Sequence, residues 1–439
     1  MMNRQPEGGM RGRLAPHTLF FIVWGLFFSG VTAGAADQVT TGQTASTWSL
    51  EACIRYAWEH NPQLQISQLE LEQYRLQQRE QWASFSPVVN SGISTQLNRP
   101  TKEQDIFYWE LSATLPLFEG GKRINRLRSS RWATSASEAD LEGLREKLRI
   151  DITRNYLQSL LSMELLRVAR ESRITLQTQR EHTHNLVEAG SLPYVSLLEV
   201  EAQLAQEIYR ETEAQHQWQE DLLSLKHLMN LPDHLSFLPD TTWLDEASAY
   251  RQEDIQALFQ QSQSYPTLRA ARSRMEQSRH QWLASQGNLF PSLSLQTHYN
   301  AYSSQKIGVQ LSLQWPIWQQ GHTIRTIREA RLAYQQAQLA LLQTQQEHYQ
   351  TLQLIIHEAA CAYQQYLAAC QNFQAQENAF GHLVHKFNLG LIDGTDYAIA
   401  HKQRVQARSE MLQSQYAYYF QCKILDYYWE SGSTDYREP

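Results

Sequence analysis

Residues 115–121 read Leu-Pro-Leu-Phe-Glu-Gly-Gly, and residues 315–321 read Trp-Pro-Ile-Trp-Gln-Gln-Gly. The two stretches match at an offset of 200 residues (316 − 116), whereas Asn61-Pro62 and Tyr265-Pro266 match at an offset of 204 (266 − 62). The chain is therefore duplicated, and the second copy has lost four residues between the two matches. A loop tolerates such a loss and a packed helix does not, so each copy is expected to contain a loop there.

Apolar and polar residues alternate on both sides of this loop, over about 88–117 in the first copy and about 291–317 in the second. Period two is the pattern of β-strands, so the sequence predicts two hairpins. Four strands of about 9 to 11 residues could each cross a bilayer, with one face towards lipid and one towards a water-filled lumen. A soluble hairpin with one buried face is the alternative. The polar positions expected to line a lumen are Asn90, Gln96, Gln296 and Gln310.

The rest of the two copies predicts helix. Residues 119–189 and 319–388 lack proline, and their apolar residues recur every three or four positions. At 1.5 Å per residue each stretch would form a rod of roughly 100 Å. Shorter helices are expected around 50–84, 194–229, 253–286 and 395–429.

The N-terminus is typical of a secretory signal peptide. Arginines precede ten apolar residues, 19–28, and Ala33-Gly34-Ala35 suits cleavage after residue 35. The apolar run is shorter than the roughly 20 residues of a spanning helix, which argues against the alternative of a membrane anchor. No cysteine follows the cleavage site closely, so a lipid anchor is not indicated.

Charge and motifs exclude several classes of function. Without residues 1–35 the chain has 35 basic (38 − 3) and 44 acidic (45 − 1) residues, a net charge of −9, which disfavours nucleic acid as a partner. The four cysteines lack the spacing of a metal site or redox pair. No catalytic motif is present, so neither enzyme activity nor a cofactor is expected.

Four spanning strands cannot close a barrel, because their two edges would leave backbone groups unpaired in hydrocarbon. The chain is therefore expected to oligomerise, and three copies with twelve strands are the simplest solution that leaves a water-filled lumen.

The chain resembles the TolC-like outer-membrane efflux proteins from Trp48 to about Trp429. The resemblance rests on the duplication, Ala57-x-x-x-Asn61-Pro62, the motif at 116–121 and the turns at Gly190 and Gly390. It implies a mostly helical homotrimer with a shared twelve-stranded β-barrel in outer-membrane lipid and a long periplasmic α-barrel. It also implies a passive exit duct of a tripartite efflux or type I secretion system, with a periplasmic adaptor and an inner-membrane transporter as partners.

The expected layout places each element in one of two repeats. Its parts are a signal peptide (1–35), a leader (36–47), a first repeat (48–230, hairpin about 88–117, turn 190–193), a linker (231–250), a second repeat (251–430, hairpin about 291–317, turn 390–394) and a tail (431–439).

The resemblance places the two turns between long helices at the periplasmic mouth, as adaptor-docking tips. Turn formation alone also accounts for their glycines, which suit helix ends. The tip candidates are Gly190, Ser191, Leu192, Val195, Gly390, Leu391 and Thr395. Just beyond the tips, Asp396 and Glu199 are candidates for acidic rings that gate the pore, and a solvated helix face is the alternative.

Two further readings remain open. His182, His184, His382 and His385 flank the tips and could indicate metal traffic, but solvated helix histidines are common and no metal site is expected. A periplasmic coiled-coil tether or adaptor without a pore would share the long helices, but the strands argue against it.

Overall fold

The computed structural model describes residues 46–96, 106–232, 235, 237–240, 255–300, 307–388, 391–392 and 394–432. The expected signal peptide, most of the leader, both hairpin loops, most of the linker, Gly390 and the tail from residue 433 lie outside these residues. The elements in chain order are β1 Ser46–Trp48, α1 Leu50–His60, α2 Pro62–Ala83, β2 Val88–Gln96, β3 Ile106–Phe118, α3 Lys122–Glu188, α4 Tyr194–Met229, β4 Phe237–Pro239, α5 Ile255–Gln261, η2 Ser262–Ser264, α6 Pro266–Gln286, η3 Gly287–Leu289, β5 Ser292–Asn300, β6 Ile307–Gln314, α7 His322–Asn388 and α8 Gly394–Gly432.

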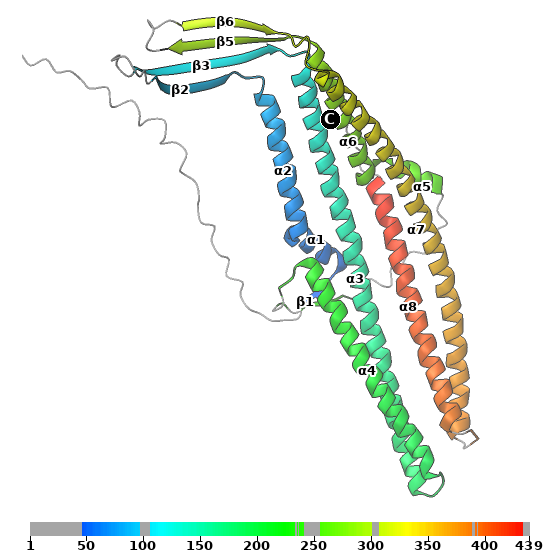
Figure 1. The fold of residues 1–439 in the computed structure, drawn as a ribbon. Helices are drawn as coiled ribbons and strands as arrows, with labels where there is room; N and C mark the ends of the chain where they lie inside the picture. Colours follow the sequence, from blue (N-terminus) through cyan, green and yellow to red (C-terminus); the bar gives the residue numbers. More distant parts are fainter. Residues whose placement is uncertain are drawn as a thin grey trace, which may run out of the picture. The chain divides into compact units, whose positions relative to one another are not determined.

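The four expected strands are confirmed and form one antiparallel sheet with the order β2-β3-β5-β6. Each hairpin contributes two neighbouring strands, and the two repeats meet where β3 pairs with β5. The sheet is drawn with labelled strands in Figure 1.

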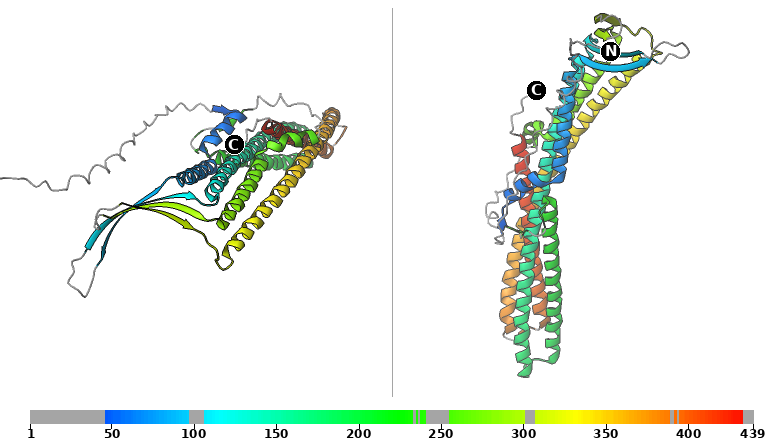
Figure 2. Two further views of the ribbon diagram at one scale, coloured as in Figure 1. Left: turned by 90° about the horizontal axis from the view of Figure 1, so that it is seen from above. Right: turned by 90° about the vertical axis from the view of Figure 1, so that its left-hand side faces the viewer.

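The helices that adjoin the strands follow the same order as the strands. α2 packs against α3, α3 against α6, and α6 against α7, so the sheet continues into a single layer of helices. Away from the sheet, α4 packs along α3 and α8 along α7, and α3 also contacts α8 (Figures 1 and 2). None of the described helices is both long and apolar enough to cross a membrane.

The prediction of one helix over 50–84 was wrong, because the chain breaks it at Asn61. Residue 61 is extended, with a ψ angle of 122°, as is usual before a proline. Its side-chain oxygen accepts a hydrogen bond from the backbone nitrogen of Gln63 at 2.9 Å, and Pro62 occupies the first turn of α2. The helix expected over 253–286 is also interrupted before Pro266, at Tyr265, whose ψ angle is 138° and whose side chain caps no backbone nitrogen.

The main hydrophobic core lies where α1 and α4 pack against the middle of α3. Its centre is Tyr156, which is fully buried among apolar side chains that include Ile152, Leu160 and Leu225. The Tyr156 hydroxyl lies 2.9 Å from the carbonyl oxygen of Trp48 and accepts a hydrogen bond from the backbone nitrogen of Asp240 at 2.9 Å. The core therefore anchors the chain before α1 and the chain after α4.

These two chain segments also form a two-stranded parallel sheet, β1 with β4, which the sequence analysis did not predict. Each strand has only three residues. A pattern this short has no readable periodicity.

The second repeat has its own core at the equivalent place. Leu258 of α5 packs with Leu352 and Ala359 of α7 and with Tyr428 of α8. His348 is buried beside them, 2.9 Å from the Ser262 hydroxyl, and loss of hydration lowers its pKa to about 4. The duplication in sequence is thus a duplication of packing.

Candidate functional site

The sheet has one polar face and one mostly apolar face, and strand register aligns each face across all four strands. On the polar face, Asn90 lies opposite Ser112, which lies opposite His298. One row further along, Thr114, Gln296 and Gln310 lie side by side. Gln96 pairs with Ile106 at the end of β2, where side chains are not described. The four predicted lumen positions therefore belong to one face.

His298 covers part of the polar face. Its ring lies over Gly308 of β6, where an added Cβ would approach the imidazole Nε2 to 2.4 Å. Glycine at position 308 thus makes room for an imidazole that the sequence analysis did not single out. The alternation of β5 could have indicated this position, because His298 is two residues from Gln296 and therefore lies on the same face of the strand.

The opposite face presents apolar side chains that the described part of the chain leaves uncovered. Ile93, Val309, Leu311 and Leu313 are all well exposed. Exposed apolar area of this extent marks a surface that meets lipid or another chain.

Arg123 joins the sheet to the helices in the first repeat. Its guanidinium donates hydrogen bonds to the carbonyl oxygens of Pro116 and Ser84, forms an ion pair with Glu119 at 3.4 Å, and lies 5.2 Å from the centre of the Phe85 ring. One side chain therefore links the ends of α2 and β3 to the start of α3.

Gly120 and Gly121 complete this junction with φ angles of 58° and 78°. At position 120 an added Cβ would lie 2.6 Å from the carbonyl oxygen of Gly287, so only glycine fits between α3 and η3. The second repeat keeps this conformation with Gln320, whose φ is 51°. Gln320 is exposed, and an added Cβ at its neighbour Gly321 would meet nothing within 4 Å.

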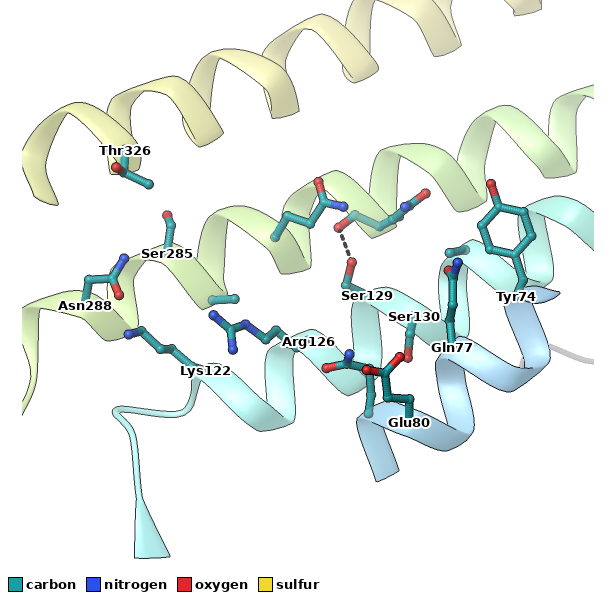
Figure 3. Close-up of a pocket in the computed structure, with 15 residues that line it drawn as sticks. Tyr74, Gln77, Glu80, Lys122, Arg126, Ser129, Ser130, Ser285, Asn288 and Thr326 are labelled. Atoms are coloured by element: carbon teal, nitrogen blue, oxygen red, sulfur yellow. Dashed lines mark hydrogen bonds between the residues drawn. The ribbon is translucent and has the colours of Figure 1, made fainter. Parts of the chain in front are cut away.

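A polar hollow of about 580 Å³ lies on the helical layer near the sheet, lined by residues of α2, α3, α6 and α7 as well as Asn288 (Figure 3). Lys122 and Arg126 provide positive charge, and Glu80 provides negative charge. Ser129 donates a hydrogen bond to the Gln277 carbonyl oxygen at 3.2 Å and ties α3 to α6 at its edge.

The first predicted tip is a tight turn between α3 and α4. Gly190 is left-handed, with a φ of 72°, and the Ser191 nitrogen donates a hydrogen bond to the Leu186 carbonyl oxygen at 2.9 Å. Ser191 and Val195 are exposed, and Leu192 is half-buried. The turn therefore presents apolar and small polar side chains to its surroundings.

The second predicted tip is described except for Gly390 and residue 393. Leu391 is exposed, and its nitrogen donates a hydrogen bond to the Lys386 carbonyl oxygen at 3.0 Å. Thr395 is exposed in the first turn of α8.

Both candidate gate residues, Glu199 and Asp396, are exposed. Asp396 lies in the first turn of α8, where the helix dipole favours a negative charge. Glu199 extends from α4 towards the second tip, and its Oε2 lies 3.9 Å from where a Cβ would stand on Gly394. Glu199 of the first tip therefore lies close to the backbone of the second tip.

Above the tips, the two helical hairpins are joined by polar groups that the sequence analysis missed. Glu207 is buried on α4 and accepts a hydrogen bond from the Ser172 hydroxyl at 2.9 Å. Burial lowers the pKa of His401, and neighbouring Glu207 opposes that shift. Arg408 of α8 forms an ion pair with Glu171 of α3 at 2.5 Å. Polar residues on polar helices gave no signal that they would be buried.

Comparisons with known proteins agree with this geometry. The outer membrane efflux protein family matches residues 53–231 and 258–422, which covers both repeats. No curated protein matches the chain in sequence.

Solved structures of outer-membrane channels share the fold. CusC, described in connection with transmembrane channel formation, superposes with a TM-score of 0.77 at 16% identity, covering 87% of this chain and 91% of CusC. The Campylobacter jejuni CmeC outer membrane channel gives 0.75 at 15% identity, covering 93% and 96%. The open Neisseria gonorrhoeae MtrE outer membrane channel gives 0.74 at 19% identity, covering 87% and 88%.

Identities this low establish the fold alone, whereas the family match spans most of the chain. The predicted resemblance is therefore confirmed: the chain belongs to the outer membrane efflux protein family and acts in the outer membrane as an efflux channel.

Proposed function

We propose that three copies of this chain form a closed exit duct, which a periplasmic adaptor connects to an inner-membrane transporter. The duct is passive: it catalyses no reaction and conducts what the transporter and adaptor deliver. The helical layer continues the barrel into the periplasm.

The observation that carries the proposal is the pair of open edges. Among the described residues, β2 and β6 each have a neighbouring strand on one side only. In a bilayer every unpaired backbone group costs several kcal/mol, so these edges must meet the edges of other copies. Two copies would give an eight-stranded barrel, whose interior is filled by side chains. Three copies would give a twelve-stranded barrel, which leaves room for water.

The faces of the sheet suit this arrangement. The exposed apolar face, with Val309, Leu311 and Leu313, would contact lipid. The polar face, with Asn90, Gln96, Gln296 and Gln310, would then line the lumen.

The turns would form the periplasmic end of the duct. Exposed Val195 and Leu391 at the two tips would offer apolar contacts for the adaptor, and Gly190, Ser191, Leu192 and Thr395 lie beside them. Gly390, outside the described residues, stays a further candidate of the second tip. Three-fold symmetry would make rings of Asp396 and Glu199 at the entrance, where like charges brought together bind cations or narrow the pore.

The test is single-channel conductance in planar bilayers. We expect steady conductance for the wild type and block by millimolar divalent cations, which is lost in Asp396→Ala. Glu410→Ala is the matched control, since Glu410 is an exposed acid of the same helix far from the tip. Failure of the wild-type protein to conduct would refute the duct, and equal effects of both variants would refute the gate.

A further inference from the structure

Because the chain is duplicated, the contact between its two repeats predicts the contact between neighbouring copies. The first repeat meets the second within the chain, where β3 pairs with β5 and α3 packs against α6. In a closed ring the second repeat would meet the first repeat of the next copy, with β6 facing β2 and α7 facing α2. By the duplication, β6 is equivalent to β3 and β2 to β5. In the same way α7 is equivalent to α3 and α2 to α6.

The two repeats keep the same residue offsets in their helices and strands, so residues of one repeat can be matched to residues of the other. α3 and α7 have identical length and begin 200 residues apart, at Lys122 and His322. In the first hairpin Val89 pairs with Ala113; the offsets of 204 and 200 then predict that residue 293 pairs with residue 313. Leu293 does pair with Leu313, so the offsets hold in the sheet.

We propose that β6 of one copy pairs antiparallel with β2 of the next in the register of the internal β3–β5 seam. Ala113 pairs with Thr297 inside the chain, which places Leu313 opposite Ile93 of the next copy. Glu110 pairs with Asn300, which places Gln310 opposite Gln96 of the next copy. This inference rests on the proposed oligomeric duct and specifies which residues build its seam.

In this register the apolar face stays apolar and the polar face stays polar across the contact between copies. Leu313 and Ile93 both belong to the apolar face, and Gln310 and Gln96 both belong to the polar face. A slip of one residue would place apolar side chains in the lumen and polar side chains in lipid.

Side-chain burial in the helices supports the same pairing. On α6, Ala270 and Ser273 are 1% and 2% exposed, and the Ser273 hydroxyl lies 3.3 Å from that of Ser135 on α3. Their equivalents on α2 are Ile66 and Leu69, which are 56% and 63% exposed. The positions that are buried in the contact between α6 and α3 thus carry exposed apolar side chains on α2, at the edge of the helical layer.

The opposite edge gives the same result. Ala139 of α3 lies one turn beyond Ser135 and is 1% exposed, whereas its equivalent Leu339 of α7 is 67% exposed. Both edges of the helical layer therefore present large apolar residues where the internal seam has small ones.

These sizes indicate that the seam between copies is wider than the internal seam. Internally, Gly120 allows the close approach of Gly287, which any side chain would block. At the outer edge Gln320 occupies the equivalent position, so the helices must stand further apart. Leu339, Ile66 and Leu69 have the volume to fill the added space.

The test is disulfide trapping with purified full-length protein in detergent. The background variant replaces the four native cysteines (Cys53, Cys361, Cys370 and Cys422) with alanine and is first shown to keep the wild-type oligomeric mass. Into it we introduce Leu313→Cys with Ile93→Cys, and oxidise with copper phenanthroline. The control pair, Leu313→Cys with Val89→Cys, uses the same face but is displaced by about 13 Å along the strand.

A bond within one chain is excluded, since β2 and β6 lie three strands apart, about 14 Å, and disulfides need Cβ atoms about 4 Å apart. We expect covalent dimers and trimers for the first pair, at least about tenfold more than for the control pair or for either single variant. Leu339→Cys with Ile66→Cys tests the helical seam independently of the strands.

The outcomes separate the inference from the proposed function. An oligomer in which the displaced pair traps as well as the predicted pair, or in which no pair traps, overturns the register and leaves the duct standing. A monomeric mass for the background variant and for the wild type overturns the duct itself.

Discussion

Substitution of Gly120 tests the internal seam, on which the arrangement of the two repeats depends. In Gly120→Ala the new Cβ would stand 2.6 Å from the Gly287 carbonyl oxygen and 2.8 Å from the Phe290 Cβ. A backbone oxygen and a Cβ cannot move away by a change of side-chain rotamer, so α3 and η3 must separate. Overpacking of this kind costs about 1 to 3 kcal/mol.

The left-handed conformation adds a second cost, about 1 to 2 kcal/mol for a residue with a side chain. The sum for Gly120→Ala is thus about 2 to 5 kcal/mol. Gly121→Ala is the matched control, because Gly121 is also left-handed, with a φ of 78°, but the nearest atom to its added Cβ is 3.8 Å away. It should cost only the backbone part, about 1 to 2 kcal/mol.

The assay is guanidinium unfolding in detergent followed by helical circular dichroism, at one fixed protein concentration since an oligomer's stability depends on concentration. We expect Gly120→Ala to be destabilised more than Gly121→Ala. Equal effects, or a larger effect of Gly121→Ala, would refute the close approach of α3 and η3 and with it the contrast between the narrow and wide seams.

Two further predictions concern the buried polar groups of the two cores. Tyr156→Phe should destabilise the protein by about 1 to 3 kcal/mol in the same assay, because two hydrogen bonds of the hydroxyl are lost, one to the Trp48 carbonyl oxygen and one from the Asp240 nitrogen, at about 0.5 to 1.5 kcal/mol each; an unchanged midpoint would contradict the anchoring role of Tyr156. Burial lowers the pKa of His348 from 6.5 to about 4, so the unfolded chain binds a proton that the folded chain does not between these pH values. Stability should therefore fall as pH decreases from 6.5 to 4, by at most about 3 kcal/mol, and the fall should be smaller in His348→Gln. A parallel fall in both proteins would assign the pH dependence to other groups.

The sequence predicted the long helices and strands well, because their signals are long. The proline-free stretch 119–189 contains α3, Lys122–Glu188, to within three residues at either end. Alternation extends over nine residues in β2 and β5, which is enough to assign both faces. Glycine and proline located the turn at Gly190, since few residues adopt its φ of 72°.

Short or non-periodic features were not predictable. The break at Asn61 was present as a motif, but its meaning depends on the cap that the asparagine side chain supplies to Gln63. β1 and β4 are three-residue strands brought together by packing around Tyr156. Glu207 and His401 are buried only because two helical hairpins meet, and neither sequence neighbourhood differs from a solvated helix. The roles of Asp396 and Glu199 remain predictions.

The central claim is that three copies close into one duct. The most direct test is native mass spectrometry of the detergent-extracted protein from outer membranes, at concentrations low enough to prevent chance association. The account predicts a single species of three times the mass of the mature chain. A monomer, or a dimer that persists across protein concentrations, would contradict it, because neither can pair the edges of β2 and β6 around a water-filled lumen.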